Sequence, residues 1–247
     1  MKAALLATPK FKDLAEVKRI LEVRGWSLVK TKPDYVITVG GDGSILYAES
    51  KYPGIPIIAL NAGELGFLAC NEVDNLEEVL DSVEKSKIVV EKRRKLEFTA
   101  GKEKGVALNE VLVTSSVAGK ALRLNIEVGG TPLGFFVCDG VLVSTPTGST
   151  GYNLSCGGPI IEPGNGVMAL TLISPHLSRL KSMVLSSGQK IAISFARENP
   201  GITVVADGLG SVRISHKEKV VIKGSKRTAK LVTRSPAYFS RLERFFI

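Results

Sequence analysis

The sequence predicts an α/β amino-terminal domain with a parallel sheet, followed by a β-rich, β-sandwich-like carboxyl-terminal domain. Over the first 88 residues, apolar runs of strand length alternate with segments of helical periodicity, which is typical of a parallel sheet covered by helices. From Ile88 onward, short β-rich runs follow one another with almost no long helix between them. With 247 residues and 44% hydrophobic content, the chain can bury two modest cores. We place the α/β domain at 1–88 with the tail 234–247, and the β-rich domain at 89–233.

The first domain begins with a short apolar run and a periodic segment. We expect helix 13–24 because Leu14, Val17, Ile20 and Leu21 share one face, and Gly25 is suited to end it. Further apolar runs and periodic segments predict the remaining elements, which are strands at 3–7, 26–30, 35–39 and 57–60 and helices at 44–52 and 76–83.

The second domain is predicted from short strands separated by turn signals, such as those at 129–132 and 199–201. The tail 238–246 has helical spacing and is expected to pack on the first domain. The expected strands lie at 106–108, 111–114, 122–128, 133–137, 141–144, 168–173, 190–195, 202–206, 212–215, 220–222 and 229–233.

The net charge of +9 indicates attraction to polyanions, among which nucleic acids, nucleotides and polyphosphates fit equally well. The densest basic cluster, at 92–95, is interpreted as a solvated strand start or linker. No aromatic-rich sheet motif or zinc-finger spacing accompanies it, so we expect no nucleic-acid partner. No apolar run is long enough to cross a bilayer, and we expect no membrane partner. Cys70, Cys138 and Cys156 form no CxxC pair, and we interpret them as reduced thiols of a cytoplasmic protein.

The segment from Gly40 to Ser44 reads Gly-Gly-Asp-Gly-Ser and ends the apolar run 35–39. Three glycines let the backbone turn tightly and approach a ligand closely, and Asp42 is the one functional side chain among them. Ser44 is expected to cap the following helix, whose N–H groups would then face an anion. A carboxylate beside such a turn suits phosphoryl transfer better than nucleotide binding alone.

Standard nucleotide and zinc motifs are absent from the sequence. There is no GxxxxGK[ST] segment, and a dinucleotide fingerprint beginning at Gly41 fails at Leu46, where glycine is needed. No HExxH motif occurs, and the two histidines, His176 and His216, lie far apart. The sequence therefore predicts no dedicated metal site.

A second candidate segment runs from Asp139 to Ile160 and is rich in hydroxyl groups and glycines. It offers short donors and acceptors suited to a sugar, a phosphate or a base edge, and Tyr152 adds a flat apolar face. The alternative is an ordinary Ser/Thr/Gly-rich loop between strands. The pair Asn109-Glu110 interrupts an apolar strand, so that one of the two side chains points inward toward either a ligand or a structural partner.

Taken in order, these segments resemble the NAD kinase family. The matching motifs are GGDGS at 40–44, NAGELGF at 61–67, NE at 109–110, DG at 139–140, TPTGSTGY…GGPI at 145–160 and a later DG at 207–208. GGDG alone also occurs in lipid kinases and phosphofructokinases, whereas the NE pair and the GSTGY block are specific.

The resemblance implies transfer of a phosphoryl group from ATP or polyphosphate to the adenosine ribose 2′-hydroxyl of NAD, giving NADP. Asp42 would accept or orient the hydroxyl proton, and Mg²⁺ or another divalent metal would neutralise phosphate charge. The family also implies a homodimer or homotetramer. The binding residues carried over by motif are Gly41, Gly43, Phe67, Asn109, Glu110, Asp139, Thr147, Thr150, Gly151, Tyr152, Ser155 and Asp207.

Three positions depart from the family pattern or extend it. Gly151 replaces a usual alanine, Lys181 stands where an arginine is usual, and His176 lies in a segment similar to the family's IxPH turn. Two alternatives to an NAD kinase are a lipid kinase of the GGDG superfamily and a non-catalytic nucleotide or nucleic-acid binder. The first leaves the NE and GSTGY motifs unexplained, and the second has no need of Asp42.

Overall fold

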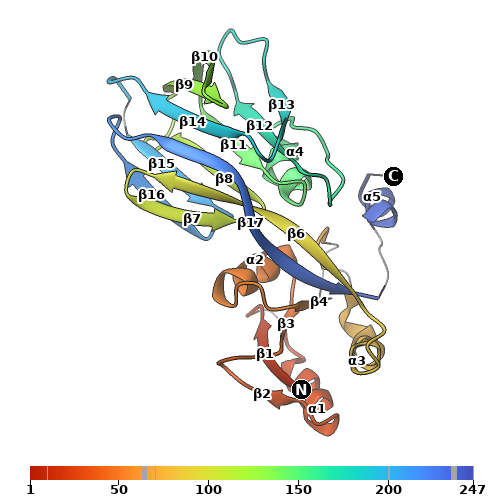
Figure 1. Ribbon diagram of the computed structural model, residues 1–247. Helices are drawn as coiled ribbons and strands as arrows, with labels where there is room; N and C mark the ends of the chain where they lie inside the picture. The colour runs from red at the N-terminus through yellow and green to blue at the C-terminus, as the bar shows by residue number, and fades with distance from the viewer. Residues whose placement is uncertain (10, 63–65, 70, 200, 235–237, 247) are drawn as a thin grey trace. The chain divides into compact units, whose positions relative to one another are not determined.

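The computed structural model describes residues 1–9, 11–62, 66–69, 71–199, 201–234 and 238–246 (Figure 1). The chain forms two compact units. Unit 1 comprises Met1–Arg93 together with Ala229–Ile247, and unit 2 comprises Arg94–Thr228. The predicted fold class, an α/β part followed by a β-rich part, is confirmed.

Unit 1 contains a parallel sheet in the order β17-β4-β3-β1-β2, with β5 also pairing with β4. The strand β17 contributes its last residues, since Leu231 and Val232 pair with Ile57 and Ile58. The strands are β1 (Lys2–Ala7), β2 (Ser27–Leu28), β3 (Tyr35–Val39), β4 (Ile57–Asn61), β5 (Asn71–Glu72) and β17 (Val220–Thr233). The predicted run at 26–30 is therefore only a two-residue strand.

Two helices of unit 1, α1 and α3, each bury one face in a shared core. Leu21 of α1 and Leu80 of α3 are fully buried and pack in one cluster with Ile37 and Leu60 of the sheet. The helices are α1 (Leu14–Val23), α2 (Asp42–Lys51), the 3₁₀ turn η1 (Val73–Asn75), α3 (Leu76–Glu84) and α5 (Tyr238–Phe246), the last ending at the carboxyl terminus in Figure 1. The predicted helices at 13–24, 76–83 and 238–246 are confirmed.

The helix after the glycine turn starts earlier than the sequence predicts. Gly41 is the N-cap and Asp42 the first helical residue, so Ser44 is not the cap. Ser44 instead lies in the first turn, and its hydroxyl donates back to the Gly41 carbonyl oxygen over 2.7 Å. The correction places Asp42 itself at the amino-terminal end of α2, where the helix dipole favours a negative charge.

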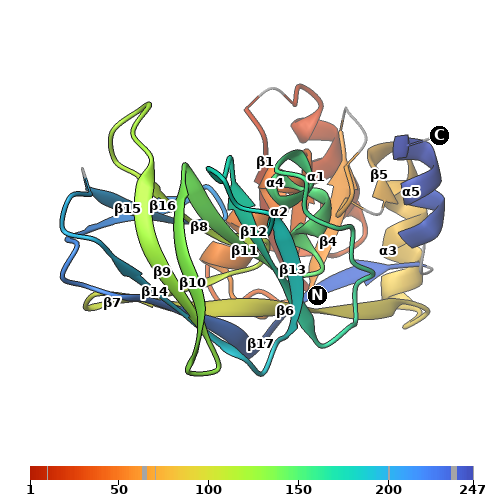
Figure 2. The ribbon, with the colours of Figure 1, turned by 90° about the horizontal axis from the view of Figure 1, so that it is seen from above.

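Unit 2 is a β-sandwich built from two antiparallel sheets, and Figure 2 shows β9 beside β10 at the edge of one of them. One sheet has the order β13-β12-β11-β8-β15-β16. The other contains β10-β9-β14-β17, with β6 pairing with β17 and β7 pairing with β6. The strands are β6 (Val89–Ala100), β7 (Glu103–Ala107), β8 (Glu110–Ser115), β9 (Leu122–Val128), β10 (Thr131–Cys138), β11 (Gly140–Ser144), β12 (Val167–Ile173), β13 (Ser182–Ser186), β14 (Lys190–Phe195), β15 (Ile202–Ala206) and β16 (Gly210–Ile214).

The core of unit 2 lies between the two sheets. Val113 of β8 and Val143 of β11 are fully buried in one cluster with Ile126 of β9 and Ile193 of β14. This packing explains the alternation of buried and exposed positions along β9, which the sequence pattern at 122–128 predicts.

Several predicted strands differ from those observed. The two strands expected at 220–222 and 229–233 form one long strand, β17, which contributes to both units. The strand β13 was not predicted, because its serine-rich sequence lacks a clear apolar alternation. Only Gly129 and Gly130 form the expected turn at 129–132, since Thr131 begins β10.

The interpretation of the basic cluster at 92–95 as a solvated strand start or linker is wrong. These residues lie within β6, where Arg93 and Lys95 are each only 5% exposed. Arg93 is paired with Glu91, two residues before it on the same side of the strand. Two of the four cationic side chains are therefore turned away from solvent.

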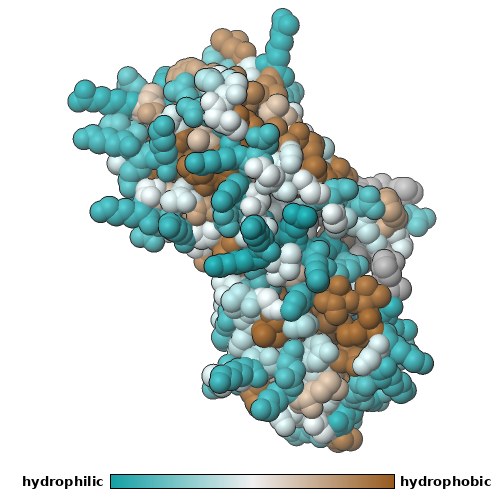
Figure 3. Space-filling view, viewed as in Figure 1, coloured by the Kyte–Doolittle hydropathy of each residue, from teal (hydrophilic) through white to brown (hydrophobic). Residues whose placement is uncertain are grey.

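The surface drawn in Figure 3 carries many hydrophilic side chains with apolar patches between them. No helix among the described residues is long and apolar enough to cross a membrane. Cys138 and Cys156 are free thiols, and Cys70 lies outside the described residues.

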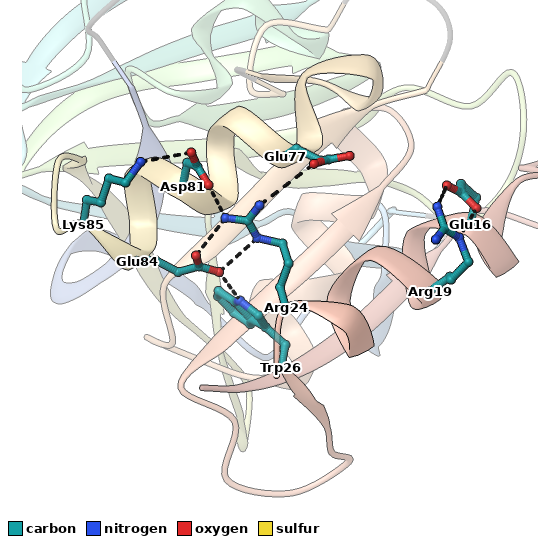
Figure 4. A network of polar contacts seen from close by, with 8 residues as sticks. All are labelled: Glu16, Arg19, Arg24, Trp26, Glu77, Asp81, Glu84 and Lys85. Carbon is teal, nitrogen blue, oxygen red and sulfur yellow. Dashed lines mark hydrogen bonds and ion pairs between the residues drawn. The ribbon is translucent and has the colours of Figure 1, made fainter.

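A polar network joins the end of α1 to α3 (Figure 4). The guanidinium of Arg24 donates to Glu84 over 2.8 Å and also pairs with Asp81. The buried indole of Trp26 donates its N–H to Glu84 over 2.8 Å. The hydrogen bond from Arg24 holds the pKa of Glu84 below its usual value. Glu84 thus accepts a hydrogen bond from the N–H group of a buried side chain.

We expect Glu84→Ala to lower the free energy of unfolding by about 1–3 kcal/mol, because the Trp26 N–H loses its acceptor inside the core. Glu84→Gln keeps an oxygen acceptor and should lose less. Urea unfolding of both variants measures this, with Glu16→Ala as a control in an exposed ion pair of the same unit. Equal midpoints for Glu84→Ala and Glu16→Ala would contradict the role assigned to Glu84.

Candidate active site

The carboxylate of Asp42 is held by the loop that follows β4. The N–H of Phe67 donates to Oδ2 over 2.9 Å, and those of Leu68 and Ala69 donate to Oδ1 over 2.9 and 3.2 Å. The loop lies so close that a Cβ built on Gly66 would be 2.3 Å from Oδ1. The orientation of Asp42 is therefore fixed by backbone groups.

The glycines beside Asp42 have different roles. Gly40 has a φ of +154°, and a Cβ there would lie 2.4 Å from the Thr8 side chain, so only glycine fits. Gly41 and Gly43 are exposed and face open space. A cavity of about 320 Å³ adjoins this turn, with Thr8, Pro9, Gly43, Ser44 and Tyr47 among its lining residues. The turn can therefore admit a ligand against its backbone.

The NAGELGF segment is described only in part, because 63–65 lie outside the described residues. Phe67 is half-buried, and its ring stacks on that of Phe245 in α5. Asn61 is 4% exposed, and its side-chain Oδ1 has no hydrogen-bond partner among the described residues. Asn61 was not predicted as a site residue by itself, although the NAGELGF motif contains it.

In unit 2, the structure brings Asn109, Glu110 and Asp207 together. The carboxylate of Asp207 accepts the backbone N–H groups of Leu108, Asn109 and Glu110 over 2.6, 2.7 and 3.1 Å. Asp207 has a φ of +51°, which is uncommon outside glycine and asparagine. The sequence predicts that Asn109 lies within a strand. It lies instead in the break between β7 and β8. Asp207 accepts the N–H groups of both residues in this break and that of Glu110, the first residue of β8.

The side chains of Asn109 and Glu110 contain unpaired oxygens. Asn109 Oδ1 and Glu110 Oε2 are buried, and neither has a hydrogen-bond partner in the described part of the chain. Burial, and then repulsion by Asp207, raises the pKa of Glu110 to about 7. Burial also raises the pKa of Asp207, against the lowering effect of its three backbone hydrogen bonds. Buried polar atoms without a hydrogen-bond partner, such as these two oxygens, are candidates for contact with a ligand.

The hydroxyl-rich segment is a compact loop built on buried hydrogen bonds. The hydroxyl of Thr145 donates to the Leu108 carbonyl over 2.7 Å and accepts the Gly148 N–H over 3.1 Å. Asn153 is fully buried, donates to the Ser149 carbonyl over 3.1 Å and accepts the Thr171 hydroxyl over 2.8 Å. Sequence reasoning missed Thr145 and Asn153 as positioning residues, since nothing in the pattern separates inward from outward hydroxyls.

The loop contains the 3₁₀ turn η2 (Gly148–Thr150) and the short helix α4 (Tyr152–Ser155). Gly151 and Ser155 are exposed, Tyr152 is 45% exposed, and Thr150 is half-buried, whereas Thr147 is only 6% exposed. A Cβ on Gly151 would lie 3.9 Å from Asn109 Nδ2 and from Glu110 Oε2. The loop therefore passes beside these two side chains, with room for a methyl group at Gly151.

Three other residues predicted or noted from the sequence, Asp139, His176 and Lys181, have exposed side chains. Asp139 is exposed, and only its backbone is fixed, with its N–H donating to the Ile173 carbonyl over 2.9 Å. His176 is exposed, and its backbone N–H donates to the Val137 carbonyl over 2.8 Å. Lys181 is exposed as well.

Comparison with known proteins identifies the family. Residues 12–88 match a model of the ATP-NAD kinase N-terminal domain, and residues 108–234 match one of the ATP-NAD kinase C-terminal domain. The chain is 34% identical over 211 residues to an NAD kinase of Thermoanaerobacter sp. (strain X514), covering 83% of this chain and 75% of the relative. It is 31% identical over 234 residues to the NAD kinase of Methanothermobacter thermautotrophicus, covering 93% and 83%. The resemblance found in the motifs is confirmed.

Two solved structures share the fold. A crystal structure of an NAD kinase from Archaeoglobus fulgidus in complex with ATP has a TM-score of 0.86 and 28% identity, covering 98% of this chain and 99% of that one. Yeast NADH kinase complexed with NADH has a TM-score of 0.89 at 20% identity, covering 98% and 86%, and supports the fold alone.

The raised pKa of Glu110 predicts a pH-dependent stability. The ordinary pKa of a glutamate is 4.5, and that of Glu110 in the folded protein is about 7. At pH values between the two, the folded protein binds this proton more tightly than the unfolded chain, so the free energy of unfolding falls as the pH rises through this window. Glu110→Gln, which cannot ionise, should match wild type near about pH 4 and exceed it by up to about 3 kcal/mol near about pH 8. Urea unfolding at both pH values measures this, and Glu103→Gln, at an exposed position in β7, is the control. An equal difference at both pH values would contradict the assignment.

Proposed function

This chain belongs to the NAD kinase family, and from that premise we propose that it transfers the terminal phosphoryl group of ATP, or of polyphosphate, to the adenosine ribose 2′-hydroxyl of NAD. The product is NADP. ATP as phosphoryl donor is supported by the ATP complex of the Archaeoglobus relative. The observation that carries the proposal is the Asp42 carboxylate, held by three backbone N–H groups in a glycine turn whose backbone is open to a ligand.

Asp42 is the proposed catalytic residue. Its carboxylate accepts or orients the proton of the 2′-hydroxyl as the phosphoryl group arrives. Because phosphoryl transfer passes through a loose transition state, correct positioning matters more than a strong base. The three hydrogen bonds supply that positioning before the substrate binds, and the bare backbone of Gly41 and Gly43 admits the donor phosphates.

The proposed NAD site uses the unpaired oxygens of unit 2. Asn109 Oδ1 and Glu110 Oε2 would each accept a hydrogen bond from the bound nucleotide, which removes the cost of leaving them unsatisfied. Asp207 fixes the backbone that presents both side chains. The remaining residues proposed to contact the substrates are Phe67, Asp139, Thr147, Thr150, Gly151, Tyr152 and Ser155.

A divalent metal, Mg²⁺ by preference, is proposed to accompany the donor phosphates. Magnesium binds hard oxygen ligands and is usually held by one or two carboxylates together with substrate phosphates. Asp42 has the right chemistry, since its three hydrogen bonds leave part of its acceptor capacity free. When bound, the ion neutralises phosphate charge.

We propose an α/β domain carrying the GGDG motif at 1–88 with the tail 234–247, and a β-sandwich NAD-binding domain at 89–233. The active form is proposed to be a homodimer or homotetramer of a cytoplasmic protein, with NAD and ATP as its small-molecule partners.

Asp42→Asn should abolish nearly all NADP formation while largely keeping NAD binding. Asparagine retains one oxygen for the loop N–H groups but cannot take up the hydroxyl proton. NADP formation from NAD, ATP and Mg²⁺, together with calorimetric titration of NAD, measures both effects. Asp74→Asn, an exposed carboxylate in η1 of the same unit, is the control. Turnover like that of wild type in Asp42→Asn would overturn the role of this carboxylate, and an inactive wild type would move the proposal to a lipid acceptor.

Asn109→Ala should raise the KM for NAD by about tenfold, the effect of losing one buried hydrogen bond to the substrate. The KM for ATP should change little. Steady-state kinetics with each substrate varied in turn gives both values, and Asn125→Ala, an exposed position in β9, serves as control. An unchanged KM for NAD would remove Asn109 from the site.

A further inference from the structure

The loop that holds Asp42 is itself contacted by the last helix of the chain. The ring of Phe67 stacks on that of Phe245 in α5, with centroids 4.1 Å apart and planes inclined by 24°. The backbone N–H of the same Phe67 donates to Asp42 Oδ2 over 2.9 Å. One residue therefore connects the catalytic carboxylate to an element at the far end of the sequence.

The segment 66–69, which holds Asp42, has no regular secondary structure. Residues 66–69 form neither helix nor strand, so no backbone ladder sets where their N–H groups point. All three N–H groups that orient Asp42 come from this segment. A side chain that restrains Phe67 consequently restrains the carboxylate as well.

The helix α5 presents Phe245 in a way suited to this contact. Tyr238, Leu242 and Phe245 follow the i, i+4, i+7 spacing of one helical face. Phe245 is 38% exposed, whereas Phe239 of the same helix is 68% exposed and meets Tyr238 edge-on. Phe239 can therefore serve as the control for Phe245, because the ring of Phe245 is stacked on Phe67 whereas that of Phe239 is largely exposed to solvent.

We propose that Phe245 is a positioning residue for the phosphoryl-transfer step, acting through Phe67 to hold the loop against Asp42. Stacked rings resist sliding and tilting, and the near-attack geometry of a reacting group is sensitive to small displacements. The inference rests on the proposed function for its catalytic consequence. The restraint on the loop itself depends only on the contacts described above.

The first test is kinetic. Phe245→Ala should lower kcat by about three- to tenfold, in keeping with the strength of one aromatic pair, with less change in the KM for NAD. Phe245→Tyr keeps the ring and should restore kcat, and Phe239→Ala should leave it unchanged. A kcat in Phe245→Ala equal to that of wild type, or a loss shared equally by Phe239→Ala, would overturn the proposal.

The second test needs no substrate. Hydrogen exchange of the amides of Phe67, Leu68 and Ala69 should be faster in Phe245→Ala than in wild type, and Phe245→Tyr should reverse the change. Unchanged exchange would overturn the restraint even if kcat fell. If wild type forms no NADP, the proposed function fails, and the exchange rates alone then support or overturn the restraint.

Discussion

In each unit, a carboxylate that accepts three successive backbone N–H groups is the interaction on which the candidate site depends. Asp42 receives the N–H groups of Phe67, Leu68 and Ala69, and Asp207 receives those of 108–110. Hydrogen bonds to an ionised acceptor are stronger than neutral ones. Residues 66–69, Leu108 and Asn109 lie in neither helix nor strand, and Glu110 begins β8, so each carboxylate accepts N–H groups where regular structure is interrupted.

The burial of Asp207 affects the pKa values of this carboxylate and of its neighbour Glu110. Asp207 is enclosed, and its pKa is raised by burial in spite of its backbone donors. Burial, and then repulsion by Asp207, raises the pKa of the neighbouring Glu110 to about 7, and Glu110 Oε2 has no partner among the described residues. Such a group weakens the folded state and remains useful only if a ligand pairs with it, which is the usual relation between stability and function at a binding site.

The loop at 145–160 illustrates how similar residues take different roles. Thr145, Ser149 and Asn153 point inward and tie the loop to the neighbouring backbone, whereas Tyr152 and Ser155 face solvent. The composition predicts a loop rich in donors and acceptors, which is observed. It does not predict which hydroxyls are used internally, because that depends on distant partners such as Thr171 and Ile161.

The sequence by itself determined the fold class, the position of most strands and helices, and the family, because periodicity and short motifs are local properties. The tertiary structure decided that Asp42 begins α2, that 220–233 is one strand, and that Arg93 and Lys95 are buried. It also decided that Asp207 reaches Asn109 and that Phe245 reaches Phe67. Each of these contacts joins residues far apart in the chain, and only packing determines which of them meet.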